Sequence, residues 1–110
     1  METTDAIAAF SALAQDTRLA VFRLLVQAGP DGILAGEISA ALDVRPNTLS
    51  ANLAILLNAG LVLNTREGRM VRYTADLEGL RSLLRFIMQD CCGGRPELCQ
   101  PVIDAVACDC

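Results

Sequence analysis

The sequence predicts a mainly α-helical domain with one small β-hairpin, and three observations support that prediction. Apolar residues recur at helical spacing in five separate segments. Between the fourth and fifth segments the pattern changes to alternation, which is typical of strands. The chain has 110 residues, the length of one domain, and its 53% hydrophobic content is high for a small monomer. We therefore expect part of its surface to pack against a second copy.

The first two predicted helices cover about Thr3–Leu13 and Thr17–Ala28. Between them, Asp16 is placed to cap the second helix, because a carboxylate there accepts hydrogen bonds from otherwise unpaired backbone amides. Gly-Pro-Asp-Gly at 29–32 is a strong turn signal, so the second helix is expected to end before it.

A short helix over about Ala35–Leu42 and a longer one from Pro46 to about Ala59 follow, with three residues between them. Pro46 suits the first position of a helix, where its missing amide hydrogen costs no hydrogen bond. Gly60 is a typical residue at the end of a helix. Two short helices joined by so tight a turn form a helix-turn-helix pattern.

The second helix of this pair has two unlike faces. Its leucines are spaced for a buried stripe, whereas the opposite face has small, polar or methyl-bearing residues and no acid. Such a face can enter the DNA major groove, where Asn52 would bond an adenine edge and Ile55 a thymine methyl. The alternative is an ordinary solvent-facing helix, although such faces usually have glutamate and lysine. The residues of this segment expected at DNA are Arg45, Asn47, Thr48, Ser50, Ala51, Asn52 and Ile55.

Alternation over 61–74 predicts a β-hairpin with its tip at Glu67-Gly68. A hairpin after a helix-turn-helix forms a wing, so the expected fold is a winged helix-turn-helix with five helices and a two-stranded wing. Arg66, Arg69 and Arg72 are placed to contact phosphates or a minor groove. The net charge is −4, yet residues 45–85 have six arginines and three acids, so the positive charge is concentrated in this part of the chain.

The last predicted helix runs from about Asp76 to Asp90 and has an almost unbroken apolar stripe. Because the preceding elements already provide a core, we expect this stripe to pair with a second copy. A helix-turn-helix of this size usually binds two half-sites as a homodimer. Residues 1–90 are thus expected to form one DNA-binding and dimerisation domain. The expected interface residues are Ile7, Phe10, Leu80, Leu83, Leu84 and Ile87.

All five cysteines lie in residues 91–110, which we interpret as a cysteine-rich, metalloid-sensing tail. Cys91 and Cys92 are adjacent, and the glycines and proline after them allow the chain to fold back and bring Cys99 near. An all-thiolate site selects soft ions. Three thiolates match the pyramidal geometry of trivalent arsenic or antimony, whereas structural zinc usually takes four ligands in two spaced pairs. Cys108 and Cys110 are candidates for additional ligands.

Two alternatives for the thiols stay open. A redox switch would form a disulfide among them, and a metal or metalloid carrier would have no DNA target. Nothing indicates an enzyme, because the chain has no histidine and no C-x-x-C motif. The odd number of cysteines, the lack of a visible secretory signal and the lack of a long apolar run favour a cytoplasmic protein with reduced thiols and no membrane segment.

Several motifs together resemble one known family. They are LAQDTRL at 13–19, PNTLSANL at 46–53, AGLV at 59–62 and REGR at 66–69 with Tyr73. With these motifs the chain resembles the ArsR/SmtB family of winged helix-turn-helix repressors over about residues 5–90. The cluster of Cys91, Cys92 and Cys99 resembles the arsenical-sensing subgroup that has its site at the C-terminal helix.

The resemblance implies a homodimeric repressor that binds double-stranded operator DNA of arsenic-resistance genes. It also implies that trivalent arsenic, or antimony, acts as the inducer and releases the protein from DNA. Many relatives have histidine where Asn52 stands, so the preferred operator bases are expected to differ.

Overall fold

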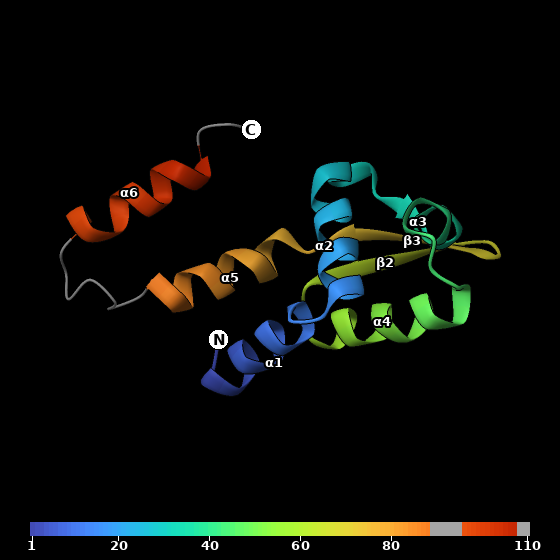
Figure 1. The fold of residues 1–110 in the computed structure, drawn as a ribbon, viewed down its shortest axis with the longest axis horizontal. Helices are drawn as coiled ribbons and strands as arrows, with labels where there is room; N and C mark the ends of the chain where they lie inside the picture. Colours follow the sequence, from blue (N-terminus) through green and yellow to red (C-terminus); the bar gives the residue numbers. More distant parts are fainter. Residues whose placement is uncertain (89–95, 108–110) are drawn as a thin grey trace.

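The computed structural model describes residues 1–88 and 96–107. Figure 1 shows the sheet, α3 and α4 at one end of the molecule, whereas α5 leads away toward α6 at the other end. The elements in chain order are α1 (Thr3–Leu13), α2 (Asp16–Ala28), η1 (Gly29–Asp31), β1 (Ile33–Leu34), α3 (Ala35–Leu42), α4 (Pro46–Asn58), β2 (Val62–Glu67), β3 (Met70–Ala75), α5 (Leu77–Met88) and α6 (Pro96–Ala107).

The sheet has three antiparallel strands in the order β1-β3-β2, so the expectation of a two-stranded wing was incomplete. The additional strand, β1, has only two residues and pairs Ile33 with Tyr73. Two residues are too few to show any alternation in sequence. Gly32 leads into β1 with a φ of +65°, and a Cβ there would lie 2.4 Å from the Tyr73 carbonyl oxygen. The short strand therefore depends on glycine and fixes the base of the hairpin to the body.

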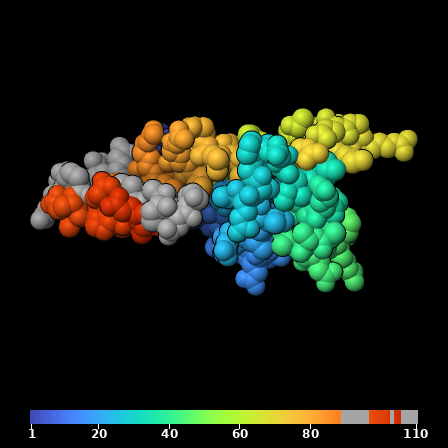
Figure 2. All heavy atoms as spheres, turned by 90° about the horizontal axis from the view of Figure 1, so that it is seen from above, coloured from blue at the N-terminus to red at the C-terminus, as the bar shows by residue number. Residues whose placement is uncertain are grey.

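The hairpin between β2 and β3 forms as the sequence predicted, with a small shift of its tip. Glu67 pairs with Met70, so the two-residue loop is Gly68-Arg69 and not Glu67-Gly68. Gly68 has a φ of +65°, which glycine adopts without steric cost. In the space-filling view the hairpin extends from the body as a narrow projection (Figure 2).

Helix α2 is capped by a different residue from the one expected. Gln15 holds the cap position and its side-chain oxygen accepts from the Arg18 backbone N–H at 2.9 Å. Asp16 is instead the first residue of the helix, where its negative charge still favours the positive end of the helix dipole.

The turn between α3 and α4 is tight because one residue adopts a left-handed conformation. Asp43 has a φ of +53°, which aspartate tolerates better than most residues. The Val44 backbone N–H donates to the Ser39 carbonyl at 3.0 Å, and the Ser39 hydroxyl donates to the Val44 carbonyl. These bonds fix the geometry between the two helices of the helix-turn-helix, as the spacing of the motif predicted.

The core is formed by side chains from α1, α2, α3, α4, the start of β2 and α5. Leu83 is its contribution from α5 and is only 2% exposed. Where the start of α5 passes the end of α4, a Cβ on Gly79 would lie 1.9 Å from the Gly60 carbonyl oxygen. This close approach requires glycine at position 79 and sets where α5 leaves the body.

Helix α6 was not predicted, because the glycines and prolines of this region indicated a broken chain. It begins at Pro96, a position where proline is tolerated, and contains Pro101, which removes one internal amide donor. The Gln100 side-chain amide donates to Asp104 Oδ1 at 2.8 Å, one turn later. The expected boundary between residues 90 and 91 lies outside the described residues.

Candidate nucleic-acid interface and thiol site

The DNA-facing surface expected on α4 is present as an exposed face. Arg45, Asn47, Thr48, Ser50 and Ala51 are all exposed, and the leucines opposite them are buried. Ile55 is 43% exposed, although it is a large apolar residue. We define the α4 face as Arg45, Asn47, Thr48, Ser50, Ala51 and Ile55.

Asn52 does not belong to that face, contrary to the expectation from the sequence. It is 9% exposed and is the buried polar residue of the described core. Its Nδ2 donates to the Thr48 carbonyl at 3.1 Å, and its Oδ1 accepts from Arg18 Nη1 at 3.1 Å. Both ends of the amide are therefore paired inside the protein, and the arrangement leaves neither of them directed to a base.

Arg18 is the residue that sequence reasoning missed. Its Nε donates to the Ala12 carbonyl at 2.7 Å, in addition to the bond from Nη1 to Asn52. The motif LAQDTRL marked this position by resemblance alone. The partner at Asn52 is 34 residues away in sequence, so no local pattern could have found the contact.

The wing arginines divide into two kinds. Arg66 and Arg69 are exposed, and within the part of the chain that the structure describes neither is in an ion pair. Arg72 is half-buried and its Nε lies 2.8 Å from Glu67 Oε2. Its Nη1 also donates to the Asp31 carbonyl at 3.1 Å. Arg72 therefore ties the wing to η1, and its expected role as a phosphate contact does not fit this arrangement.

The Arg72–Glu67 pair shifts both titrations in the directions that a salt bridge requires. The hydrogen bond from Arg72 holds the pKa of Glu67 below its ordinary value, and the same bond raises the pKa of Arg72. Both groups are at the surface, so solvent screening keeps the energetic effect small.

The expected dimer residues also divide into two kinds. Ile7 is 61% exposed and Leu84 44% exposed, and Phe10 and Ile87 are exposed as well. Leu83 lies in the core and Leu80 packs partly against it, so Leu83 cannot contact a second copy as expected. A shallow apolar groove of about 390 Å³ runs along α5, lined by Leu77, Leu80, Arg81, Leu84, Arg85 and Met88.

Of the five cysteines, only Cys99 lies within the described residues. It is half-buried on α6 and is disulfide-bonded, whereas the sequence predicted a reduced thiol. A disulfide sulfur has no thiolate with which to bind a soft ion. Cys91, Cys92, Cys108 and Cys110 lie outside the described residues. Residues 1–88 and 96–107 contain no group of three side chains that could hold a metal ion.

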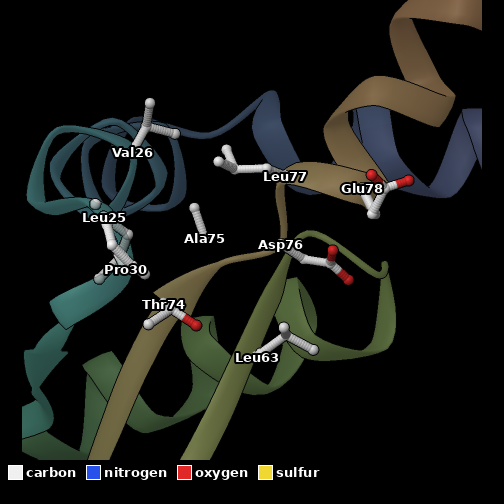
Figure 3. A pocket seen from close by; sticks show the side chains of 10 residues that line it. Leu25, Val26, Pro30, Leu63, Thr74, Ala75, Asp76, Leu77 and Glu78 are labelled. Atoms are coloured by element: carbon white, nitrogen blue, oxygen red, sulfur yellow. The ribbon is translucent and has the colours of Figure 1, made fainter.

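A hollow of about 520 Å³ lies between the end of α2, η1, the sheet and the start of α5. Figure 3 shows Leu25, Val26, Pro30 and Leu63 around it, with the carboxylates of Asp76 and Glu78 at one side. Asp76 Oδ1 accepts from the Gly79 backbone N–H at 3.1 Å and so caps α5. The lining is mostly apolar.

Within the described residues, no helix is both long enough and apolar enough to cross a membrane. 

Comparison with known proteins places these features in a family context. Residues 13–64 match a family described as a helix-turn-helix domain. A protein of Halobacterium salinarum, named "Putative arsenical resistance operon repressor ArsR", is 34% identical over 73 residues. That alignment covers 66% of this chain and 56% of the relative, so the chain spans little more than half of that relative's length.

The chain also matches two solved structures, and each match covers most of this chain and most of the matched one. The homodimeric winged helix-turn-helix DNA-binding domain of a possible ArsR-family transcriptional regulator from Mycobacterium bovis is 30% identical, with a TM-score of 0.62, and the match covers 79% of this chain and 81% of that one. A protein described as a possible transcriptional regulator for arsenical resistance is 28% identical, with a TM-score of 0.62, covering 86% and 92% respectively.

Proposed function

This chain belongs to the ArsR/SmtB family of winged helix-turn-helix transcriptional regulators, and from that membership we propose that it is a cytoplasmic, homodimeric repressor that trivalent arsenic releases from operator DNA. The observation behind the DNA-binding part is the exposed α4 face, which has no acidic residue. Helix α4 lies at the same end of the molecule as the β2–β3 wing (Figure 1). The family is one of DNA-binding regulators and not of enzymes.

The α4 face has the chemistry that a major groove requires. Asn47 and Thr48 offer hydrogen-bonding groups, and Ala51 and Ile55 offer methyl groups for thymine. Arg66 and Arg69 are free to approach phosphates beside the groove. Phosphate contacts set affinity and its salt dependence, whereas contacts to base edges set the sequence preference.

Exposed apolar residues of the protomer support the proposal of a homodimer. Ile7 and Phe10 on α1, with Leu84 and Ile87 on α5, are exposed and large. Contiguous exposed apolar surface on a small protein usually marks an interaction site. Two copies would place two α4 helices about one DNA turn apart, on the half-sites of a pseudo-palindromic operator. The homodimeric relative from Mycobacterium bovis supports this arrangement.

Cys91, Cys92 and Cys99 are the proposed ligands of the inducer. A reductant must first supply two electrons and two protons to open the disulfide at Cys99. Arsenous acid would then exchange its three hydroxyls for the three thiols, releasing three waters and forming three As–S bonds; trivalent antimony has the same preference for soft sulfur. Two of the relatives compared above are named for arsenical resistance, which supports arsenic as the inducer. Because inducer and DNA would favour different conformations, each would weaken binding of the other, by a coupling of about 1–3 kcal/mol.

A titration with matched variants tests this proposal. Fluorescence anisotropy would follow reduced protein on its own promoter DNA while arsenite is added in the presence of a non-thiol reductant. We expect release, and we expect Cys92→Ser and Cys99→Ser to bind DNA normally but to stay bound under arsenite. Cys110→Ser is compared in the same assay because Cys110 is a candidate additional ligand, and release by arsenite as in wild type would place it outside the ligand set. If Cys92→Ser lost operator binding altogether, the segment would be a structural element and not a sensor.

A second candidate, a thiol redox-sensing repressor, is favoured by the disulfide at Cys99. Closing a disulfide transfers two electrons and two protons to an oxidant such as peroxide. In the same assay this candidate predicts release by peroxide without arsenite, a mass loss of about two per disulfide formed, and recovery of DNA binding after reduction. Release by arsenite under full reduction would contradict it.

A further inference from the structure

Arg18 connects three helices through its one side chain. Its own helix, α2, begins two residues earlier. Its Nε donates 2.7 Å to the Ala12 carbonyl on α1, and its Nη1 donates 3.1 Å to Asn52 Oδ1 on α4. The Gln15 side chain accepts from the Arg18 backbone N–H at 2.9 Å, and this bond fixes the position of the Arg18 backbone at the start of α2.

The contact with α1 gives the Ala12 carbonyl a hydrogen-bond donor that the helix itself cannot provide. Ala12 is the second-last residue of α1, and the last four carbonyls of a helix lack intrahelical donors. Ala12 is also buried, so without Arg18 this carbonyl would lack a partner away from water. A guanidinium near the negative end of a helix dipole gains a further favourable interaction.

The contact with α4 continues into the backbone of that helix. Asn52 uses its Oδ1 for Arg18 and its Nδ2 for the Thr48 carbonyl at 3.1 Å. The amide orientation is thereby fixed from both sides. Thr48 itself is exposed on the α4 face. The rotation of α4 about its own axis is therefore linked, through two side chains, to the end of α1.

We propose that Arg18 is a positioning residue for DNA recognition, which holds the α4 face at a fixed rotation relative to α1. In the proposed homodimer, α1 presents Ile7 and Phe10 to the second copy, so this link sets the α4 face relative to the dimer interface. Asn52 is then the connecting group and reads no base itself. The planar fork of arginine reaches both acceptors at once, which the single ammonium of lysine cannot do with the same geometry. The inference rests on the proposed DNA-binding function.

The test is a double-mutant cycle. For each variant it measures the ratio of the affinity for a specific duplex to the affinity for a non-specific one. Wild-type protein first selects a preferred duplex from a random library. Arg18→Met, Asn52→Leu and the double variant are then compared on that duplex and on a scrambled one at equal salt, with concentrations counted as folded dimer. We expect each single variant to lower the ratio of specific to non-specific affinity about tenfold, and the double variant to be no worse than the weaker single variant.

Arg23→Met is the matched control, since Arg23 is an exposed arginine of the same helix; its ratio should stay that of wild type. Arg18→Lys retains the charge, and its ratio should lie between those of wild type and Arg18→Met. Arg18→Lys also serves as the test variant if Arg18→Met folds poorly. A purely structural role for Arg18, or a phosphate contact by it, would lower both affinities equally, and an unchanged ratio would overturn the inference.

A base-reading Asn52 would also overturn it. In that case Asn52→Leu would relax the preference at one base pair alone, Arg18→Met would leave that preference intact, and the two effects would add. Failure of the proposed function looks different, because wild-type protein would then select no preferred duplex at all.

Discussion

Helices α4 and α5 have similar leucine stripes, but the protomer uses them in opposite ways. Leu49, Leu53 and Leu56 of α4 are all buried. The core therefore covers the apolar face of α4, and its polar face remains exposed to a partner. On α5, Leu83 is buried whereas Leu84 and Ile87 remain exposed. Helical spacing therefore identifies an apolar face but does not say what covers it.

The largest effect should come from a core leucine of α4. Leu53→Ala removes a fully buried side chain and leaves a cavity, so we expect the free energy of unfolding to fall by about 2–5 kcal/mol. Urea unfolding monitored by circular dichroism measures it. Leu77→Ala is the control on α5, because Leu77 is 55% exposed and is not one of the proposed interface residues. It should cost much less, and equal losses would mean that Leu77 is as well covered as Leu53.

A charge on the exposed part of α5 should separate the protomers. Ile87→Glu places a carboxylate where we propose apolar contact with a second copy, and we expect the dimer dissociation constant to rise at least about tenfold. Sedimentation velocity across a concentration series measures this, with Ser50→Glu on the α4 face as the control for added charge. A dissociation constant that Ile87→Glu left unchanged would place the interface elsewhere.

A smaller effect is expected on the α4 face itself. Ile55→Ala removes an exposed side chain, so stability should change by no more than about 0.5 kcal/mol. Operator affinity should nevertheless fall by about 1 kcal/mol, the order of one lost base contact. Anisotropy with the selected duplex measures it. Unchanged affinity would show that Ile55 is only a solvent-exposed residue.

The smallest effect concerns the wing and pH. The pKa of Glu67 is lowered by its hydrogen bond to Arg72 from an ordinary value of 4.5. The stabilisation is therefore complete above pH 4.5 and is lost as the pH falls through the lowered pKa. The protection factors of the β2 and β3 amides, which are exchange rates corrected for the intrinsic effect of pH, should fall over that range in wild type. Glu67→Gln should remove the pH dependence, and an identical dependence in both proteins would contradict the account.

The sequence predicted the elements whose signals are local. Pro46 and Gly60 marked both ends of α4, and alternation over 61–74 marked the hairpin, because caps and side-chain periods act over a few residues. The short β1 has no period to detect, and α6 forms in a segment where glycine and proline indicated a break.

The site was harder to predict because its details depend on tertiary contacts. Asn52 and Arg72 were assigned to DNA by residue type and position, but they bind Arg18 and Glu67 of the same protomer. Leu83 was assigned to the interface because it shares a stripe with Leu84, and only the packing of α5 on the body separates the two. Charge and periodicity thus predicted which faces of α4 and α5 are exposed, whereas the contacts of individual residues depend on residues far away in the sequence.

The central claim is that α4 binds DNA while α5 contacts the second copy. The stoichiometry of the DNA complex tests this claim most directly. Sedimentation velocity of the reduced protein with its selected duplex measures how many chains bind one duplex. The account predicts two chains on each duplex, with Ile87→Glu reducing this complex and Ile55→Ala weakening it without dissociating the free dimer. One chain per duplex at saturation, or no complex with any duplex, would contradict it.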